Sequence, residues 1–401
     1  MNALERIIQG LCPNGVEYKS LAEIGDFIRG QGLQKVDFVE SGEACIHYGQ
    51  IYTIYKKYVF ETKSFVTPQL KMKLKTAPPG SLIITTTSEN VIDVAKTVVW
   101  LGQGDVVFGG HSCAFTHREN PRYLAYALES SEFQAAKNAL VQGTKVKDIS
   151  LSKLGSIRIP LPPMEVQNAI VEILDSFYEL EAELEAELDA RRKQLKHYRS
   201  VLFELDSAPE VPLAKTCSRV SSGGTPSRSR QDFFIGKIPW LRTQEVNFDE
   251  IWATDLCISE EAMASSSAKW VPKNTVIVAM YGATAAKVAV AKISLTTNQA
   301  CANLEIDPEI ANYRYVFHYL MNKYEHLKSQ GQGTQSNLSL QQIKLYPIKL
   351  PPIEIQNQIA KQLDSLFELS NNESAGIPAE LSLRHKQYEY YRDQLLTFKE
   401  S

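Results

Sequence analysis

The 401-residue chain lacks the marks of several protein classes. It has no apolar run approaching the length that crosses a bilayer, and its first residues lack the basic-then-apolar order of a secretory signal. Its formal net charge of −3 gives it no general signature of nucleic-acid binding. We therefore expect a soluble, cytoplasmic protein without membrane association, in which any DNA binding depends on local basic patches or on a partner.

Cysteines are few and scattered. The six occur singly, without the Cys-x-x-Cys spacing of a redox or zinc site. Cys45 lies two residues from His47, and Cys113 lies two residues from His111, so these four side chains could complete a tetrahedral metal site. Because the spacing within each pair is shorter than zinc sites normally use, reduced structural thiols are the favoured interpretation and a metal site is the alternative.

Motifs for catalysis are also missing. The chain has neither the Gly-x-x-x-x-Gly-Lys-Ser/Thr loop that holds nucleotides nor a Gly-x-Gly-x-x-Gly turn. The prolines of Pro-Pro-Met and Pro-Pro-Ile are preceded by Leu, so they do not form the Asn/Asp-Pro-Pro-aromatic motif of amino-methyltransferases. Seven histidines occur without a His-x-x-x-His pair. We predict a protein that recognises a ligand, catalyses nothing and binds no cofactor of its own.

What the sequence does contain is an internal duplication. Residues 161–168, Leu-Pro-Pro-Met-Glu-Val-Gln-Asn, return 189 positions later as residues 350–357, Leu-Pro-Pro-Ile-Glu-Ile-Gln-Asn. Leu-Asp-Ser at 174–176 likewise returns at 363–365. A chain of this length suits two or three domains, and self-similarity on this scale fixes the architecture as two copies of one unit.

After the Pro-Pro of each repeated block the sequence becomes helical in pattern. From Met164 to about Leu205 there is no Pro or Gly, and apolar residues recur in steps of three and four, as in a coiled-coil seam. Such a helix is roughly 60 Å long. A second run from Ile355 has the same seam, interrupted by a loop within 371–378. The double proline favours a helix start. A solvated charged linker is the alternative, disfavoured by the apolar stripe.

The segments before these helices have short β-like runs between turns, at 81–87, 97–101 and 275–280, and each segment closes with an amphipathic helix, at 122–141 and 312–328. The expected fold is α+β: two mixed, mostly β globular domains alternate with two long helices that pair as an antiparallel coiled coil, in a pseudo-twofold repeat. The expected boundaries are 1–150, 151–207, 208–340 and 341–401.

This ordered set resembles the specificity subunit of Type I restriction-modification systems over essentially the whole chain. The markers are the two Leu-Pro-Pro-x-Glu-x-Gln-Asn blocks and, in the second half, Ser-Gly-Gly-Thr-Pro-Ser at 222–227, Ile-Pro-Trp at 238–240 and Tyr-Gly-Ala-Thr at 281–284. The resemblance implies that 1–150 and 208–340 are target recognition domains, each reading half of a split double-stranded DNA site. It implies that the helical regions set the half-site spacing and hold two methyltransferase subunits. Restriction and translocase subunits would complete the complex, and the partners would use S-adenosylmethionine, ATP and Mg.

Candidate DNA contacts follow from the chemistry of readout. Arg or Lys suits guanine edges, Asn or Gln suits adenine edges, and cations with backbone N–H groups suit phosphates. Glycines and hydroxyls at 221–230 predict a phosphate loop, with a flexible surface loop as the alternative. Trp240 could anchor the backbone so that Arg242 and Gln244 face a groove, and Gln50 is the corresponding residue in the first half. For either Gln, a structural amide is the alternative.

Basic segments complete the set. Alternation at Lys71, Lys73 and Lys75 predicts three cations on one strand face, where a solvated surface is the alternative. The halves diverge at Arg29 to Gly32 against Ser222 to Thr225, as two different half-sites would require. The candidates are Arg29, Gln50, Lys56, Lys57, Lys71, Lys73 and His111 in the first half, and Ser222, Gly223, Gly224, Thr225, Arg228, Arg230, Arg242, Gln244, Tyr281, Lys287, Asn298 and Gln299 in the second.

A second function class fits the same pattern. An interaction scaffold would use its helices to bind one partner and its globular domains to bind protein, and the weak overall charge favours this slightly. Salt-dependent affinity for DNA separates the two functions, because only a DNA reader shows it.

Overall fold

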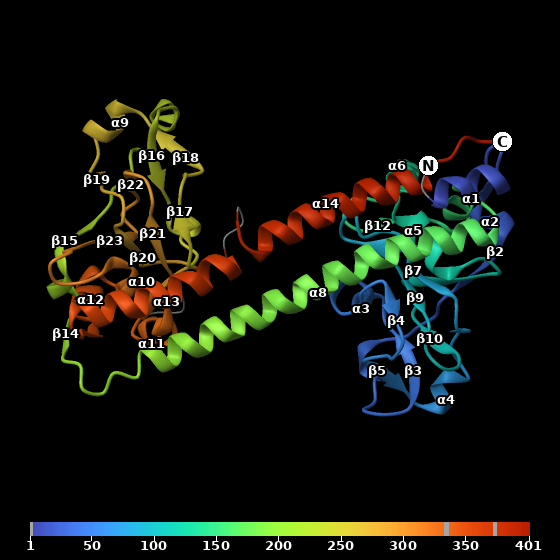
Figure 1. Ribbon diagram of the computed structural model, residues 1–401, viewed down its shortest axis with the longest axis horizontal. Helices are drawn as coiled ribbons and strands as arrows, with labels where there is room; N and C mark the ends of the chain where they lie inside the picture. Colours follow the sequence, from blue (N-terminus) through green and yellow to red (C-terminus); the bar gives the residue numbers. More distant parts are fainter. Residues whose placement is uncertain (1–2, 333–336, 372–374) are drawn as a thin grey trace. The chain divides into compact units, whose positions relative to one another are not determined.

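The computed structural model describes residues 3–332, 337–371 and 375–401, and it divides into two compact units (Figure 1). Unit 1 consists of Met1–Glu183 and Ser382–Ser401, and unit 2 consists of Leu184–Leu381. The long helix α8 (Met164–Leu202) contributes to both units, as does α14 (Ile377–Leu396). In the residues that the structure describes, no helix is long and apolar enough to cross a bilayer.

Unit 1 contains a five-stranded and a four-stranded sheet. The five-stranded sheet has the order β2 (Gly25–Arg29), β11 (Ser112–His117), β7 (Leu82–Thr85), β9 (Thr97–Trp100), β4 (Tyr58–Val59). The four-stranded sheet has the order β5 (Ser64–Val66), β3 (Glu43–Ile46), β10 (Val106–Phe108), β6 (Thr76–Ala77). Neighbouring strands are antiparallel except for β4 with β9 and β3 with β10, which are parallel.

Unit 2 repeats this topology strand for strand. Its five-stranded sheet has the order β15 (Cys217–Ser222), β23 (Cys301–Ile306), β20 (Val276–Ala279), β21 (Val288–Ala291), β17 (Glu250–Ile251). Its four-stranded sheet has the order β18 (Leu256–Ile258), β16 (Ile238–Leu241), β22 (Leu295–Thr297), β19 (Trp270–Val271). The parallel pairs, β17 with β21 and β16 with β22, also correspond. The duplication predicted from the sequence is confirmed.

Alternating side chains of β7 build two cores. Leu82 and Ile84 are fully buried against the helical layer, whereas Ile83 is fully buried with Phe108 of the four-stranded sheet. Successive strand residues point to opposite faces, so a strand buried on both sides has a continuous apolar run. Each such side chain contributes about 2 kcal/mol of burial free energy. The predicted strands at 81–87, 97–101 and 275–280 are confirmed as β7 with β8 (Thr87–Ser88), β9 and β20.

The two amphipathic segments each form two helices instead of one. The first is α5 (Pro121–Glu129) and α6 (Ser131–Leu140), and the second is α10 (Tyr313–Asn322) and α11 (Tyr324–Ser329). Ser130 has a ψ of 148° and its hydroxyl accepts the N–H of Phe133. A serine that caps a new helix ends the preceding one. The prediction of single helices at 122–141 and 312–328 was therefore wrong.

The long helices start directly after the Pro-Pro pairs of the repeated blocks, as the sequence predicted. α8 begins directly after Pro163, and α13 (Ile353–Asn371) begins directly after Pro352. The second helical region continues as α14 from Ile377, and residues 372–374 of the predicted loop lie outside the described part. Within unit 1 the Phe177 and Tyr391 rings of α8 and α14 stack at 5.3 Å. Within unit 2, Leu195 of α8 shares a core with α13. Antiparallel pairing along the whole length stays a prediction.

Both units attach their long helices through a two-stranded sheet. In unit 1, β1 (Tyr18–Ser20) pairs with β13 (Arg158–Pro160), and in unit 2, β14 (Glu210–Pro212) pairs with β24 (Pro347–Lys349). The chain end adds to the first of these, because the Val16 N–H donates to the Lys399 carbonyl at 2.9 Å. Gly15 has a φ of +108°, and a Cβ there would lie 2.5 Å from that carbonyl oxygen. Only glycine therefore fits at this position.

Candidate nucleic-acid interface

The repeated Gln-Asn of the two motifs fixes each globular part on its long helix. Gln167 is fully buried; its Oε1 accepts the N–H of Asn120 at 3.1 Å and its Nε2 donates to the Pro162 carbonyl at 2.9 Å. Gln356 accepts the N–H of Asn312 at 3.0 Å and donates to the Pro351 carbonyl at 2.8 Å. Every polar atom of these buried amides is satisfied, which burial requires.

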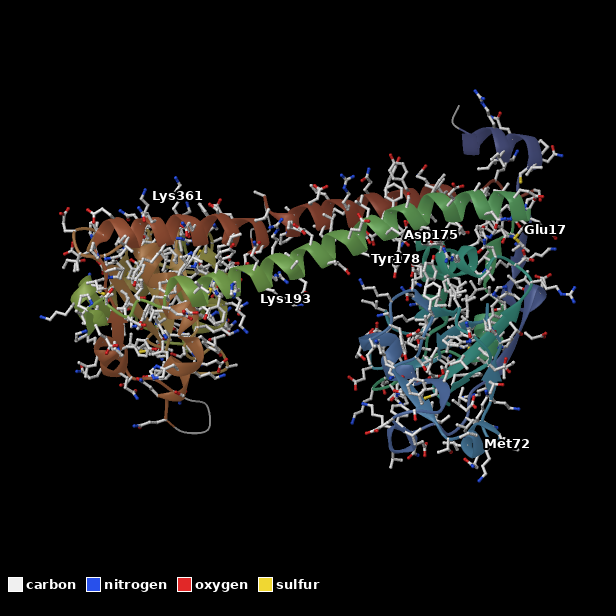
Figure 2. The ribbon with its side chains drawn as sticks, turned by 60° about the horizontal axis from the view of Figure 1, so that its bottom comes forward. Glu17, Met72, Asp175, Tyr178, Lys193 and Lys361 are labelled. Carbon is white, nitrogen blue, oxygen red and sulfur yellow. The ribbon has the colours of Figure 1, made fainter. Side chains whose placement is uncertain are left out.

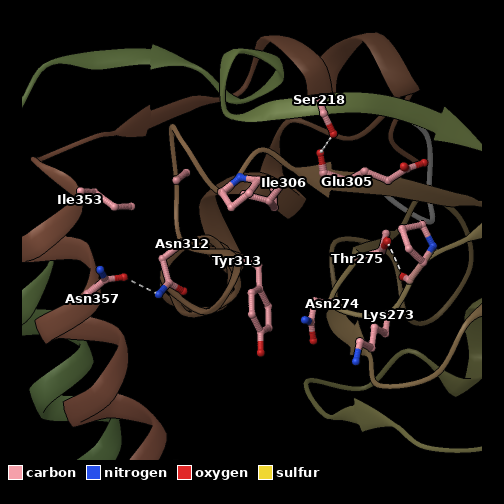
Figure 3. Close-up of a pocket in the computed structure, with 13 residues that line it drawn as sticks. Ser218, Lys273, Asn274, Thr275, Glu305, Ile306, Asn312, Tyr313, Ile353 and Asn357 are labelled. Carbon is pink, nitrogen blue, oxygen red and sulfur yellow. Dashed lines mark hydrogen bonds between the residues drawn. The ribbon is translucent and has the colours of Figure 1, made fainter.

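The asparagines of the motifs complete the same joint. Asn168 accepts from the Asn120 side chain at 2.7 Å, and Asn357 accepts from Asn312 at 2.7 Å (Figure 3). Asn120 and Asn312 are themselves the N-caps of α5 and α10. The octapeptide that marks the duplication is thus structural, because its polar side chains hold a helix start on α8 or α13.

A cavity of about 510 Å³ lies beside the joint of unit 2 (Figure 3). Asn312 and Asn357 line it together with Tyr313, Asn274 and Lys273. The two asparagines are already bonded to each other across it. The cavity therefore belongs to the joint and not to the loops that follow the sheets.

Several strand ends meet at one edge of unit 2. Ser222 at the end of β15 lies opposite Ala302, Ala279 at the end of β20 lies opposite Cys301, and Leu241 at the end of β16 lies opposite Thr297. The loops at 223–230, 242–247, 280–287 and 298–300 leave from these ends, and we call this set the unit 2 edge. Loops on a rigid sheet are where binding residues are usually carried.

Contacts between these loops bring the predicted residues together. The Thr225 hydroxyl donates to Gln299 Oε1, and the Trp240 indole N–H donates to the Gly224 carbonyl at 3.0 Å, which confirms Trp240 as an anchor. Thr284 donates to the Thr243 carbonyl at 2.7 Å. Of the predicted residues, the edge holds Ser222, Gly223, Gly224, Thr225, Arg228, Arg242, Gln244, Tyr281, Lys287, Asn298 and Gln299.

Exposure decides which of these side chains are available to a ligand. Gln244, Gln299, Tyr281 and Arg228 are exposed. Lys287 donates to Asn247 Oδ1 at 2.6 Å, and Asn298 accepts the N–H of Ala300 at 3.2 Å. Arg242 pairs with Asp255 at 3.2 Å and with Glu245 at 3.5 Å. Exposed glutamines suit adenine edges, and the held Lys287 suits guanine edges or phosphates. Two carboxylates already neutralise Arg242, so its predicted role in the groove is disfavoured.

Two predictions in the glycine loop fail on packing. A Cβ at Gly223 would lie 2.0 Å from the Thr297 carbonyl oxygen, and one at Gly224 would lie 2.3 Å from Ala268 N. The Gly224 N–H already donates to Thr297 O at 2.9 Å. Both glycines are buried against protein backbone, so the prediction that they let a phosphate approach was wrong.

Arg230 is the last residue of the 223–230 loop and is held by two carboxylates. Its guanidinium pairs with Asp232 at 2.5 Å and with Glu261 of α9 (Glu260–Ala264) at 3.1 Å, and it lies over the Phe233 ring. These hydrogen bonds raise the pKa of Arg230. Two carboxylates already neutralise this cation, so its predicted role at a phosphate is disfavoured.

The corresponding edge of unit 1 has different chemistry. Arg29 ends β2 opposite Cys113, and His111 directly precedes β11. The His111 Nδ1 lies 2.9 Å from the Thr87 hydroxyl, and its ring lies 4.7 Å from Tyr48. Arg29 and His111 are exposed. Sequence reasoning did not single out Thr87, this partner of His111, although it is the last residue of the β-like run at 81–87.

Two first-half candidates belong to the interior. Gln50 accepts the N–H of His47 at 3.0 Å and donates to Ser64 at 2.7 Å, so the alternative of a structural amide holds. The Lys57 ammonium pairs with Glu129, donates to the Tyr388 hydroxyl at 3.1 Å and lies 4.2 Å from the Tyr126 ring centroid. Its side chain is only 6% exposed. The prediction of a phosphate contact by Lys57 was wrong.

The other first-half lysines are placed differently from the prediction. Lys71 ends α4 (Pro68–Lys71) and Lys73 lies in the following turn, so no strand carries them on one face. Lys71 pairs at 2.5 Å with Glu43, at the start of β3, whereas the edge lies at the other end of that strand. Their neighbour Met72 lies at the end of unit 1 away from α8 (Figure 2). Lys56 and Lys73 are exposed.

The thiols of the two Cys-His pairs are buried. Burial raises the pKa of Cys45 and of Cys113 to about 12, which keeps both protonated at neutral pH. Within residues 3–332, 337–371 and 375–401 no group of three or more His, Cys, Asp and Glu side chains is placed to hold a metal ion.

Comparison with known proteins agrees with this architecture. The model of the Type I restriction modification DNA specificity domain matches the chain twice, at residues 13–191 and 217–383. The specificity subunit of the Type I restriction enzyme EcoR124I/EcoR124II from Escherichia coli is 32% identical over 265 residues, which are 62% of this chain and 65% of that subunit. A putative type I specificity subunit from Mycoplasma pneumoniae is 29% identical over 290 residues, 70% of this chain and 74% of its own length.

Solved structures share the fold. The crystal structure of the S subunit from M. genitalium superposes with a TM-score of 0.59 at 16% identity, covering 96% of this chain and 97% of that one. A chain from a structure of a type I R-M system gives a TM-score of 0.62 at 16% identity, covering 96% and 98%. The chain belongs to the Type I restriction-modification specificity family and carries its DNA specificity domain twice.

Proposed function

We propose that this chain is the non-catalytic subunit that reads DNA sequence in a Type I restriction-modification complex. Each globular domain reads one half of a bipartite, asymmetric site in double-stranded DNA. The observation that carries the proposal is that two copies of one sheet scaffold present different side chains at the same edge: Arg29 and His111 in unit 1, and Gln244 and Gln299 in unit 2. Different side chains on equal scaffolds read different bases.

The proposal assigns the segments as the sequence predicted. Residues 1–150 and 208–340 are the recognition domains, and 151–207 and 341–401 are the spacer helices, which pair and set the distance between half-sites. Deleting one helical turn from each of α8 and α14 should change the permitted spacer and leave both half-sites as they were. Mapping methylated bases in a host that carries the variant measures this. A changed half-site with an unchanged spacer contradicts the role of the helices.

Partners supply the chemistry. Two methyltransferase subunits dock on the helices and use S-adenosylmethionine, while restriction and translocase subunits use ATP and Mg. The methyltransferase extrudes the target base, because duplex bases are otherwise out of reach. A cytoplasmic location places the complex with the DNA of its host.

Salt-dependent binding tests the proposal against a protein-interaction scaffold. Fluorescence anisotropy with labelled duplex, on the chain together with its methyltransferase, should give a log affinity that falls linearly with log salt concentration. The slope is about −0.9 for each phosphate contacted. A duplex that carries the mapped site should bind more tightly than a scrambled duplex at every salt concentration. An affinity that does not depend on salt contradicts DNA reading and favours the scaffold.

A further inference from the structure

Helix α8 carries three cations on one face where it runs through unit 2. Arg192, Lys196 and Arg199 are spaced by four and three residues, which places them on one side of a helix. All three line a cavity of about 400 Å³, whose other wall includes Tyr324 of α11 and Phe248. Such a cavity with one sign of charge on its helical side favours an anion.

Arg199 is the buried member of this set. The residue is 9% exposed, and its Nε and Nη2 atoms have no hydrogen-bond partner among the residues that the structure describes. Burial lowers the pKa of Arg199 to about 10, so it is still protonated at neutral pH. An unpaired buried charge costs several kcal/mol, and a bound anion removes that cost. Glu325 also lines the cavity, but in the described part of the chain no ion pair joins it to the three cations.

The arginine at the corresponding position of the repeat has a carboxylate partner. Tyr198-Arg199 corresponds to Tyr391-Arg392, and the residue after Arg392 is Asp393, whose Oδ1 lies 3.0 Å from both Nε and Nη2 of Arg392. The corresponding residue in α8 is Ser200. One copy of the repeat therefore neutralises its arginine internally, whereas the other leaves the guanidinium to a ligand.

The cavity lies next to the unit 2 edge, because Phe248 lines it and also contacts an edge lysine. The Lys287 ammonium lies 5.7 Å from the centroid of the Phe248 ring, and that ring lies 5.0 Å from the Tyr324 ring. Phe248 thus separates an edge lysine from the wall of the basic cavity. A duplex read at the edge would bring its sugar-phosphate backbone to this side of unit 2.

We propose that Arg192, Lys196 and Arg199 bind a backbone phosphate of the DNA whose half-site the unit 2 edge reads. The inference rests on the proposed function and extends it to a contact on a spacer helix. A planar guanidinium donates two parallel hydrogen bonds to a phosphate, and the two exposed cations add charge. The contact adds affinity without reading sequence, because phosphates carry no base identity.

The test uses variants that leave the interior intact. Ser200→Asp places a carboxylate where Arg392 has Asp393, and the double change Arg192→Ala with Lys196→Ala removes the exposed cations. Lys193→Ala is the matched control, because Lys193 lies on the same helix (Figure 2), is 76% exposed and pairs with Asp189. Circular dichroism and the melting temperature verify that each variant is folded.

Binding is measured by anisotropy on the chain with its methyltransferase, at several salt concentrations, on the mapped site and on a site with its second half scrambled. We expect both test variants to bind each duplex about tenfold more weakly. We expect the salt slope to become shallower by about one, and the control to match the unchanged protein. Equal weakening on both duplexes identifies a phosphate contact.

A ligand other than a DNA phosphate in the cavity would give different results in these measurements. Test variants that bind DNA as the unchanged protein does overturn the phosphate assignment, whereas an unchanged protein without salt-dependent affinity overturns the proposed function itself. Loss of methyltransferase assembly at unchanged DNA affinity assigns the cavity to a partner's carboxylate. A rise in melting temperature with inorganic phosphate that Ser200→Asp abolishes, at unchanged DNA affinity, assigns it to a free anion. Both of these results overturn the proposal.

Discussion

In both units a carboxylate of the long helix pairs with an arginine of the globular part, but the other partners of that carboxylate differ. In unit 1 the Asp175 carboxylate of α8 pairs with Arg122 at 2.5 Å, and in unit 2 the Asp364 carboxylate of α13 pairs with Arg314 at 2.6 Å. The next turn of the capped helix then contributes a second donor. In unit 1 this is the Tyr126 hydroxyl, at 2.7 Å from Asp175.

In unit 2 the corresponding donor is His318, whose Nε2 lies 2.7 Å from Asp364. The imidazole is fully buried, and burial lowers its pKa to about 4 against the opposing effect of Asp364. A phenol stays neutral at every pH that the fold experiences, whereas an imidazole does not. Two joints of equal geometry therefore differ in their response to acid. The motif residues keep the geometry, and the neighbouring residues diverge in chemistry.

Removing the shared carboxylate should have the largest effect. Asp175→Ala leaves Arg122 and the hydroxyls of Tyr126 and Tyr58 without their acceptor, and we expect a loss of about 3 kcal/mol in the free energy of unfolding. Asp364→Ala should cost less, because this side chain is 28% exposed against 13% for Asp175. Urea unfolding measures both.

A matched control lies on the surface of α8. Asp189 is 64% exposed and pairs with Lys193 in an i, i+4 contact, so Asp189→Ala should leave the unfolding free energy nearly unchanged. Equal losses for Asp175→Ala and Asp189→Ala would show that the joint does not depend on its carboxylate.

Exchanging the second donors tests the comparison directly. The folded pKa of His318, about 4, lies below the unfolded value near 6.5, so the unfolded chain binds more protons between these values. Stability present above pH 6.5 is then lost as the pH falls towards 4, by roughly 3 kcal/mol at most. His318→Tyr should abolish this loss in unit 2, and Tyr126→His should introduce it in unit 1.

Hydrogen exchange of peptides from α10 and α5, followed from pH 7 to pH 4.5 and corrected for the intrinsic rate, reports each joint separately. Protonation of Asp364 does not affect the measurement between pH 7 and pH 4.5, because its pKa is lowered below the ordinary carboxyl value of 3.8. A pH profile of α10 that His318→Tyr leaves unaltered would assign the acid response to other groups.

The sequence contained enough to predict the scaffold. The duplication, the helix starts after Pro163 and Pro352, and three of the buried strands follow from spacing and composition, which are local properties. Gln167 and Gln356 were recognised as a repeated pair, but their hydrogen bonds to helix caps nearly fifty residues upstream were not predictable from spacing.

The candidate site was predicted less well, for a physical reason. Lys56 and Lys57 are adjacent and identical in type, yet one is exposed and the other buried. The difference depends on Glu129 and on Tyr388, which lie 72 and 331 residues from Lys57 along the chain. Gly223 looked like a phosphate-binding glycine, although Thr297 of another strand is what requires it. Long-range packing decides such cases, and one sequence does not show it.

Lys57 offers the smallest and most selective test of the two units. Its counterpart in the repeat is Asp249, which is exposed, so only unit 1 buries a cation at this position. Lys57→Met keeps the apolar stem and removes the ammonium group that pairs with Glu129. The Glu129 carboxylate is 37% exposed and can be hydrated. We expect a loss of about 1 kcal/mol in unfolding free energy, because the freed carboxylate regains water.

The salt slope of DNA binding by the Lys57→Met variant should not change, since a buried ammonium contacts no phosphate. Lys73→Ala, which removes an exposed cation, is the comparison that leaves stability unaltered. A shallower slope for Lys57→Met would mean that the lysine leaves its carboxylate when DNA binds.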